Sequence, residues 1–216
     1  MFITFEGIEG CGKSTQSRMV RDHLQASGVP VVWTREPGGC ELGVRLRAML
    51  LGREGADLTA HAELFLYLAD RAQHVAEVIR PALAEGRIVL CDRFTDSTVA
   101  YQGYGRGLDL EMLHAVNQVA VNGCLPDLTI ILDLPVETGL ARARSRNEEQ
   151  DQSESEGRFE AESLAFHQRI RDGYLALSAV DRTRYAVIPA NGSPDQVFSK
   201  ILPLLSARLG LKTQPA

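Results

Sequence analysis

The chain has 216 residues, of which 44% are hydrophobic and 24% are charged, and its formal net charge is −5. This length and composition are typical of a water-soluble chain that buries one sizeable core. The acidic balance argues against a general nucleic-acid or membrane-surface binder, which normally carries a basic face.

No apolar run approaches the ~20 residues that a membrane-spanning helix needs, and the first residues carry no secretory signal pattern. The four cysteines, Cys11, Cys40, Cys91 and Cys124, lie far apart, without the spacing of a zinc site or a disulfide framework. We therefore expect a cytoplasmic protein with reduced thiols and with neither a membrane nor a nucleic acid as partner.

Short apolar segments alternate with segments of helical periodicity along the whole chain. The predicted strands are residues 2–6, 29–34, 87–92, 127–134 and 184–189. The predicted helices are residues 13–26, 41–51, 59–84, 95–102, 109–121, 136–146, 158–178 and 194–209. This alternation predicts a three-layer α/β fold, in which a parallel sheet of about five strands is covered by helices on both faces.

Two segments are predicted to be irregular. Residues 103–107 are rich in glycine and should form a loop between two helices. Residues 147–157 are acidic and lack apolar periodicity, which is typical of a mobile surface loop. Because no repeat or long linker divides the chain, we predict one domain, residues 1–216, with a flap at residues 142–160.

A phosphate-binding motif follows the first predicted strand directly. Residues 7–14, GIEGCGKS, match G-x-x-x-x-G-K-[ST] and precede a helix, which is the context that this motif requires. The glycines let backbone N–H groups turn toward phosphate oxygens, and the helix adds its positive N-terminal end. The predicted ATP-binding residues are Gly7, Ile8, Glu9, Gly10, Cys11, Gly12, Lys13, Ser14 and Thr15. Lys13 should reach the β- and γ-phosphates, and Ser14 and Asp92 are the candidate Mg²⁺ ligands.

The remaining motifs narrow the class of nucleotide-binding protein. A GTPase would carry an N-K-x-D motif after a later strand, and this sequence has none. A motor or a helicase would be larger and more basic. A small domain with an arginine-rich segment before its last helices fits a nucleotide or small-metabolite kinase better.

Three groups of residues could hold the phosphate acceptor. Tyr67, Arg71 and His74 fall on one helical face, which could stack on a base and bond to its edge, or could be a solvated stripe with an Asp70–His74 pair. Asp92 and Arg93 end a predicted parallel strand, where ligands bind in open α/β sheets, although they could also simply pair with each other.

The later Thr98, Tyr101 and Gln102 share a helical face that could cover and read a base. The third group, Arg142, Arg144 and Arg146, could be a solvated charge run. Beside a phosphate-binding loop, arginines are also natural stabilisers of a phosphoryl group in transfer.

Taken together, these motifs resemble the bacterial branch of the thymidylate kinases. The resemblance is carried by FEGIEGCGKST, TREPGG, ADRAQ, CDRF, STVAYQGYGRG, LPDLTIILDL and GLARARSR, which follow in matching order from residue 2 to about residue 175. It implies a P-loop NTPase fold, a homodimer, and Mg²⁺-dependent transfer of the γ-phosphate of ATP to dTMP, a step toward dTTP for DNA replication.

The resemblance also implies roles for individual residues. It assigns these positions to the dTMP site: Glu9, Arg35, Tyr67, Arg71, Arg93, Ser97, Thr98, Tyr101 and Gln102. Tyr67 would stack on thymine, Tyr101 would lie against the deoxyribose, and Glu9 would turn away from ATP toward the sugar. The expected catalytic residues are Lys13, Arg93, Arg142, Arg144, Arg146 and Arg158. Because the acceptor phosphate has a second pKa of ~6, it is largely a dianion at neutral pH and needs no general base.

Two departures from the family pattern concern the flap and the thiols. Residues 157–160 read GRFE, so Gly157 replaces the usual acidic residue, which leaves flap closure and metal binding there open. Cys11 lies inside the phosphate loop, and a helix N-terminus can lower the pKa of a thiol. We hypothesise that alkylation of Cys11 blocks ATP binding, although an inert small side chain is an equal alternative.

Two alternative functions remain at this point. The chain could phosphorylate another nucleotide or a nucleoside, such as dUMP or a deoxynucleoside. It could also be a nucleotide-binding regulatory protein without catalysis, although Lys13, Ser14 and Arg93 argue against that.

Overall fold

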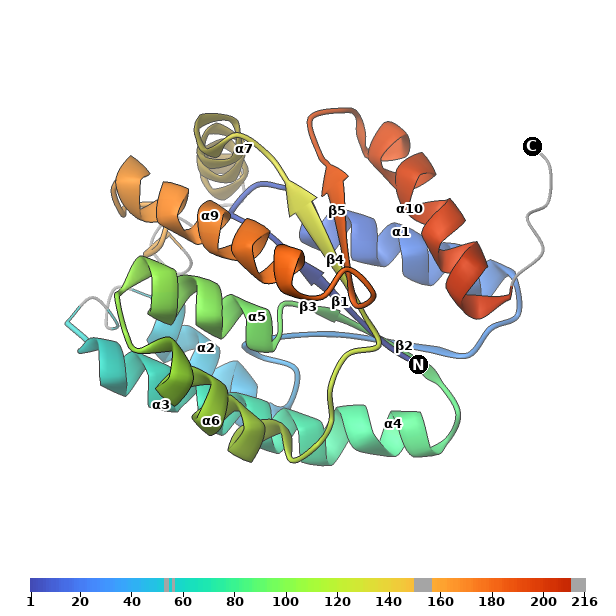
Figure 1. The fold of residues 1–216 in the computed structure, drawn as a ribbon, viewed down its shortest axis with the longest axis horizontal. Coiled ribbons are helices and arrows are strands. Elements are labelled where there is room, and N and C mark those ends of the chain that lie inside the picture. Colours follow the sequence, from blue (N-terminus) through green and yellow to red (C-terminus); the bar gives the residue numbers. More distant parts are fainter. Residues whose placement is uncertain (53–54, 56, 150–156, 211–216) are drawn as a thin grey trace.

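The computed structural model describes residues 1–52, 55, 57–149 and 157–210 (Figure 1). The described strands are β1 (Phe2–Glu6), β2 (Val31–Arg35), β3 (Ile88–Asp92), β4 (Leu128–Asp133) and β5 (Tyr185–Pro189). They form one parallel sheet in the order β2-β3-β1-β4-β5, which confirms the predicted fold class. All strands run in the same direction, so their carboxyl ends meet at one edge of the sheet.

Helices cover both faces of this sheet (Figure 1). One face carries α1 (Lys13–Ala26) and α10 (Pro194–Leu209). The other face carries α3 (Ala60–His74), η2 (Val75–Ile79), α4 (Arg80–Ala84), α5 (Thr95–Thr98), η3 (Val99–Gly105), α6 (Leu110–Val121) and α9 (Leu164–Val180). Two further helices, α2 (Glu41–Leu51) and α7 (Val136–Glu149), pack against α3 and α9 respectively. None of the described helices combines the length and the apolar composition needed to cross a membrane.

Several helices begin at a side chain that accepts a hydrogen bond from an otherwise unpaired backbone N–H group. Thr59, Asp109 and Ser163 cap α3, α6 and α9 in this way. Ser193 caps α10 through a reciprocal pair of bonds with Gln196. Such caps each stabilise a helix start by about 1 kcal/mol, so they place the helix boundaries by local chemistry.

The central strands β1 and β3 are buried along their whole length, and successive side chains enter different hydrophobic clusters. Phe2 and Val89 pack with Ile79 in one cluster. Ile3 belongs with Val20 to the larger cluster that joins the sheet to α1 and α10. This alternation is the period of two that a strand imposes, and it fixes the register of the sheet.

The structure corrects three predicted boundaries. Residues 103–105, predicted as a loop, continue a π-helix, because Gly103 and Gly105 allow close packing: a Cβ there would lie 2.6 Å from Leu110 and 2.8 Å from Phe166. The helix predicted to start at residue 158 starts at Leu164, after its cap. Residues 147–149, predicted as part of the loop, extend α7, and of the predicted loop 147–157 residues 150–156 lie outside the described residues.

Candidate active site

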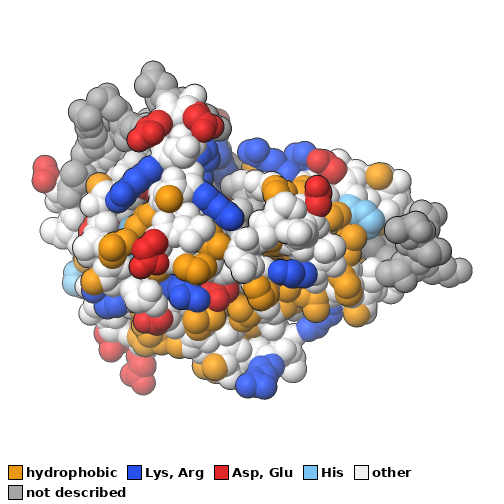
Figure 2. Space-filling view, turned by 90° about the horizontal axis from the view of Figure 1, so that it is seen from above, with side chains coloured by type: hydrophobic (Ala, Val, Ile, Leu, Met, Phe, Trp, Pro, Cys, Tyr) orange, Lys and Arg blue, Asp and Glu red, His pale blue; other side chains and the backbone are white. Residues whose placement is uncertain are grey.

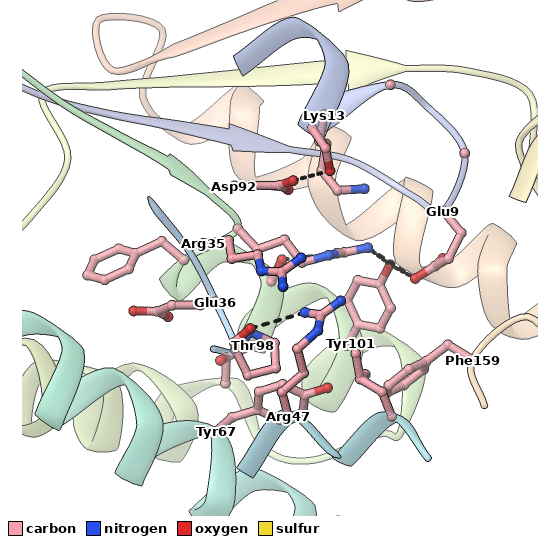
Figure 3. A pocket seen from close by; sticks show the side chains of 18 of the residues that line it. Glu9, Lys13, Arg35, Glu36, Arg47, Tyr67, Asp92, Thr98, Tyr101 and Phe159 are labelled. Carbon is pink, nitrogen blue, oxygen red and sulfur yellow. Dashed lines mark hydrogen bonds and ion pairs between the residues drawn. The ribbon is translucent and has the colours of Figure 1, made fainter. Parts of the chain in front are cut away.

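A cavity of about 650 Å³ lies at the carboxyl ends of β1, β2 and β3. It joins the glycine loop to the segments that were predicted from the sequence to hold the phosphate acceptor. Lys13 and Asp92 lie at one end of the cavity and Tyr67 at the other, with Arg35 between them (Figure 3). One continuous space could therefore hold two ligands end to end.

At Gly10 the glycine loop approaches α7 too closely for a side chain. A Cβ on Gly10, whose φ is 68°, would lie 2.0 Å from the carbonyl oxygen of Gly139. Lys13 is buried, and its Nζ donates to the carbonyl oxygens of Gly7 at 2.9 Å and Ile8 at 2.8 Å. Five residues of the loop and the following helix line the cavity: Gly10, Gly12, Lys13, Ser14 and Thr15. Gly7 and Ile8 instead hold the Lys13 side chain through their carbonyl groups.

Ser14 and Asp92 meet at the same end of the cavity, where the Ser14 hydroxyl donates to the Asp92 carboxylate. These hard oxygen donors fit Mg²⁺, which prefers carboxylate, hydroxyl and phosphate oxygens. In the part of the chain that the structure describes, no three His, Cys, Asp or Glu side chains group as a metal site. An ion held by Ser14 and Asp92 would therefore take its other ligands from nucleotide phosphates and water.

Arg93 lines the cavity and has a left-handed backbone conformation, with φ 73°. Its guanidinium donates to Glu9 at 3.1 Å, to the Tyr101 hydroxyl at 2.9 Å, to Ser97 at 3.2 Å and to Tyr174 at 3.3 Å. Its ion pair is with Glu9, so the alternative that Asp92 and Arg93 simply pair with each other is wrong. A non-glycine residue in this region of φ is strained, and such strain persists where surrounding contacts enforce it.

Glu9 accepts hydrogen bonds from Arg93 and from the hydroxyl of Tyr101, and Figure 3 shows its carboxylate turned toward Tyr101. Its other carboxylate oxygen lies 3.2 Å from Nδ1 of the buried His167. Burial alone would raise the pKa of Glu9, but His167 and the charges of Arg93 and Lys13 lower it well below its usual range. Glu9 is therefore an anion fixed among cations.

Behind Arg93, the fully buried Glu6 accepts hydrogen bonds from the Phe94 backbone at 2.7 Å, from Ser97 at 2.6 Å and from Tyr174 at 3.0 Å. Burial and the nearby Asp96 carboxylate raise the pKa of Glu6 to about 7. Since Ser97 and Tyr174 also contact Arg93, the hydrogen bonds of Glu6 hold in place two residues that surround the guanidinium.

At the far end of the cavity, Tyr67 lies beside a buried arginine. Arg71 is held by Glu36 at 2.9 Å, by Thr98 at 2.8 Å, by Asn117 at 2.6 Å and by the Phe94 carbonyl at 3.0 Å. A guanidinium has five N–H groups, so these four bonds leave one, on Nη2, that can serve a ligand.

His74, predicted on the same face, points into the protein instead. Its ring lies 2.9 Å from Glu36 and 2.7 Å from Thr34, and both His74 and Asp70 are fully buried. The alternative of a solvated stripe is therefore wrong.

The flap arginines divide into two pairs. Arg142 and Arg146 line the cavity. Arg144 donates to the Glu160 carbonyl, and Arg158 pairs with Glu63 at 2.6 Å; neither is among the described residues that line the cavity. Phe159, between these segments, packs edge-on against Tyr101 with ring centroids 5.3 Å apart.

The proposed reactivity of Cys11 is not supported by its surroundings. The thiol is 2% exposed, and burial raises its pKa, outweighing the nearby charges of Lys13 and Arg93. The prediction of a lowered thiol pKa at the helix N-terminus is wrong, because desolvation is the larger effect.

Several residues in or near the site were not predicted from the sequence. They carry acidic or basic side chains in or near the cavity, all buried or partly buried except the exposed Arg18, and they are Glu6, Arg18, Glu36, Arg47, Glu63 and His167. Glu36 could have been found, because it lies within REPGG. The others lie in helices or strands, where periodicity shows which face a residue occupies but not that its side chain contacts the site.

Comparisons with known proteins show the family to which this chain is similar. A family model described as thymidylate kinase matches residues 5–201. A thymidylate kinase of Solidesulfovibrio magneticus is 62% identical over 201 residues, which cover 93% of this chain and 96% of the relative. The chain belongs to the thymidylate kinase family. The predicted family and enzyme class are thus confirmed.

Other members of the thymidylate kinase family give the same result. A thymidylate kinase of Desulfovibrio desulfuricans is 56% identical over 209 residues, covering 97% of this chain and 96% of the relative. The crystal structure of thymidylate kinase from Ehrlichia chaffeensis matches with a TM-score of 0.76 and 34% identity, covering 95% of this chain and 98% of that one. The thymidylate kinase fold therefore extends over nearly the whole chain.

Proposed function

We propose that this chain transfers the γ-phosphate of ATP to dTMP, giving ADP and dTDP, which supplies dTTP for DNA replication. The observation that carries the proposal is the single cavity that joins Lys13 and Ser14 to Tyr67 and Arg71. ATP would bind at the glycine loop, and dTMP would lie along the rest of the cavity. The acceptor phosphate and the γ-phosphate would then meet beside Arg93.

The transfer is a direct in-line displacement. A bond forms between an oxygen of the acceptor phosphate and the γ-phosphorus, while the bond to the bridging oxygen of ADP breaks and its electron pair leaves with ADP. The acceptor is already largely a dianion, so no side chain has to remove a proton. The problem that the residues solve is the repulsion between two polyanions.

Lys13, Arg93, Arg142 and Arg146 would supply positive charge around the transferring group. Burial would lower the pKa of Arg93, but Tyr101, Tyr174 and Glu9 raise it, so the guanidinium stays charged. Ser14 and Asp92 would hold Mg²⁺, which when bound neutralises phosphate oxygens. Arg144 and Arg158 would contribute through the flap, residues 142–160, of which 150–156 lie outside the described residues.

At the acceptor end, Tyr67 would stack on the base while Arg71, Thr98 and Gln102 would bond to its edge. Tyr101 would pack against the sugar. Ser97, Arg35 and Glu9 would complete the site, with Glu9 directed at the sugar hydroxyl. Each of these side chains lines the cavity.

We also propose a cytoplasmic homodimer with no nucleic-acid partner. Six of the ten exposed large apolar side chains among the described residues lie on α2, α3 and α6: Leu42, Val44, Met49, Phe65, Leu110 and Val119. These helices pack together and could present an apolar face to a second copy. Light scattering coupled to gel filtration would measure the mass in solution, and a monomer at micromolar concentration would contradict the dimer.

Figure 2 shows Lys and Arg interspersed with Asp and Glu on the visible face, which gives no basic track for a phosphate backbone.

The test of the activity is a coupled assay of ADP release with dTMP, dUMP, dCMP, AMP and thymidine as acceptors. We expect a clear preference for dTMP. No preference would favour a kinase of another nucleotide, and ATP binding without turnover at saturating dTMP and Mg²⁺ would favour a regulatory nucleotide-binding protein.

A further inference from the structure

A buried carboxylate behind the cavity contacts one of the residues proposed to read the base. Glu63, on α3, is fully buried and is not among the described residues that line the cavity. Its Oε1 accepts a hydrogen bond of 2.8 Å from Nε2 of Gln102, which is itself 1% exposed and does line the cavity. The carboxylate therefore stands behind Gln102 rather than beside a ligand.

Two guanidinium groups fix this carboxylate in place. Arg158 lies 2.6 Å from Glu63 Oε2, and Arg106 contacts both oxygens at 3.4 Å. Arg106 is in turn held by Glu162 at 2.5 Å. An ionised carboxylate between two cations can only accept hydrogen bonds, and so it faces the amide nitrogen of Gln102 and not its carbonyl oxygen.

This contact removes the ambiguity that an amide side chain otherwise has. A glutamine can present either a donor or an acceptor to a ligand, depending on which way its amide is turned. Because one N–H of the amide is donated to Glu63, the amide is held in the orientation that leaves its carbonyl oxygen, an acceptor, for the cavity. Beside it, Arg71 offers its remaining N–H, a donor.

We propose that Glu63 is a positioning residue that orients the Gln102 amide and thereby selects a pyrimidine with an N3–H donor next to a C4 carbonyl acceptor. Thymine and uracil have this pattern. Cytosine has the reverse pattern, with an acceptor at N3 and an amino donor at C4. Its N3 would face the acceptor of Gln102, and its amino group would face the donor of Arg71. The inference rests on the proposed function and adds the residue that sets its choice of base.

The experiment compares Glu63→Gln with Glu162→Gln. The first variant keeps the shape of the side chain but gives it an amide, so the Gln102 amide can turn over. The second is a matched control, because it removes the other carboxylate on Arg106 without touching Gln102. The readout is the ratio of the dissociation constants of dCMP and dTMP, measured by calorimetry on the full-length enzyme, together with kcat at saturating dTMP.

For Glu63→Gln we expect the dCMP-to-dTMP ratio to fall about tenfold, which is the effect of one misdirected hydrogen bond. The value of kcat at saturating dTMP reports separately on Arg158, which loses its charged partner in the same variant. For Glu162→Gln the ratio should not change. In a Gln102→Leu background, Glu63→Gln should have no further effect on the ratio, because the amide through which it acts is gone.

An unchanged ratio for Glu63→Gln, with or without a lower kcat, would overturn the inference, since Glu63 would then serve only stability or the flap. An equal fall of the ratio in the Gln102→Leu background would overturn it as well. Failure of the proposed function looks different: the parent enzyme itself would then show no preference among the pyrimidine monophosphates.

Discussion

The ion pair between Glu36 and Arg71 gives a quantitative test of how the base end of the cavity is held. Both side chains are 2% exposed, and the carboxylate also contacts His74 at 2.9 Å. Glu36→Ala would leave the guanidinium of Arg71 buried without its carboxylate partner. Breaking a buried pair in this way typically destabilises a protein by about 3–5 kcal/mol, because an uncompensated charge stays in a poorly solvated site.

The expected loss can be converted into a melting temperature. For a domain of this size, 1 kcal/mol lowers Tm by roughly 2–4 °C, so Glu36→Ala should lower Tm by roughly 6–20 °C. The assay is thermal unfolding followed by circular dichroism at a single scan rate and pH. The matched control is Glu41→Ala, which breaks a pair with Arg45 whose side chains are 85% and 73% exposed. That change should shift Tm by less than about 2 °C, since solvent screens exposed pairs.

A double variant separates the charge from the packing. Glu36→Gln with Arg71→Met replaces the pair by uncharged groups of similar size, and it should be more stable than Glu36→Ala. If Glu36→Ala and Glu41→Ala lowered Tm equally, the reasoning would be refuted, because breaking a buried pair would then cost no more stability than breaking an exposed one. A double variant as unstable as Glu36→Ala would show that an unpaired charge does not cause the effect, because the double variant carries no such charge.

Three further predictions concern turnover, pH and the thiols. Arg93→Ala should lower kcat more than tenfold while changing the Kd of dTMP less, because its charge matters most during transfer; equal turnover in steady-state assays of variant and parent would contradict this. The raised pKa of Glu6 means that the folded state holds its proton more tightly than the unfolded chain, so the free energy of unfolding should fall as pH rises from 4.5 to about 7. Glu6→Gln should flatten that fall in urea titrations at several pH values, and an unaltered slope would disprove the assignment. All four cysteines are buried, so a chromogenic disulfide reagent should titrate them fully only after unfolding; rapid reaction of Cys11 in the native enzyme would speak against its burial.

Sequence patterns predicted the parts of this protein that depend on neighbouring residues. The glycine loop is contiguous, and its position between a strand and a helix is itself a local feature, so the place of Lys13 and Ser14 at the cavity could be predicted without coordinates. The parallel sheet followed from the alternation of strands and helices. Local patterns gave wrong predictions in two places. Gly103 and Gly105 allow close packing of a helix and do not form a loop, and burial raises the pKa of the Cys11 thiol where a helix N-terminus would lower it.

The contacts that shape the site join residues far apart in the chain. Glu6 meets Tyr174, Glu9 meets His167, and Glu63 meets Arg158 only because α3, α9 and the residues before α9 pack around the ends of the strands. A hydrogen bond needs its two partners placed to within a few tenths of an ångström, and helical or strand periodicity says only which way a side chain faces. The sequence alone therefore determined the phosphate loop, the order of the elements and the family, whereas the partners of each buried charge were decided by the packing of distant segments.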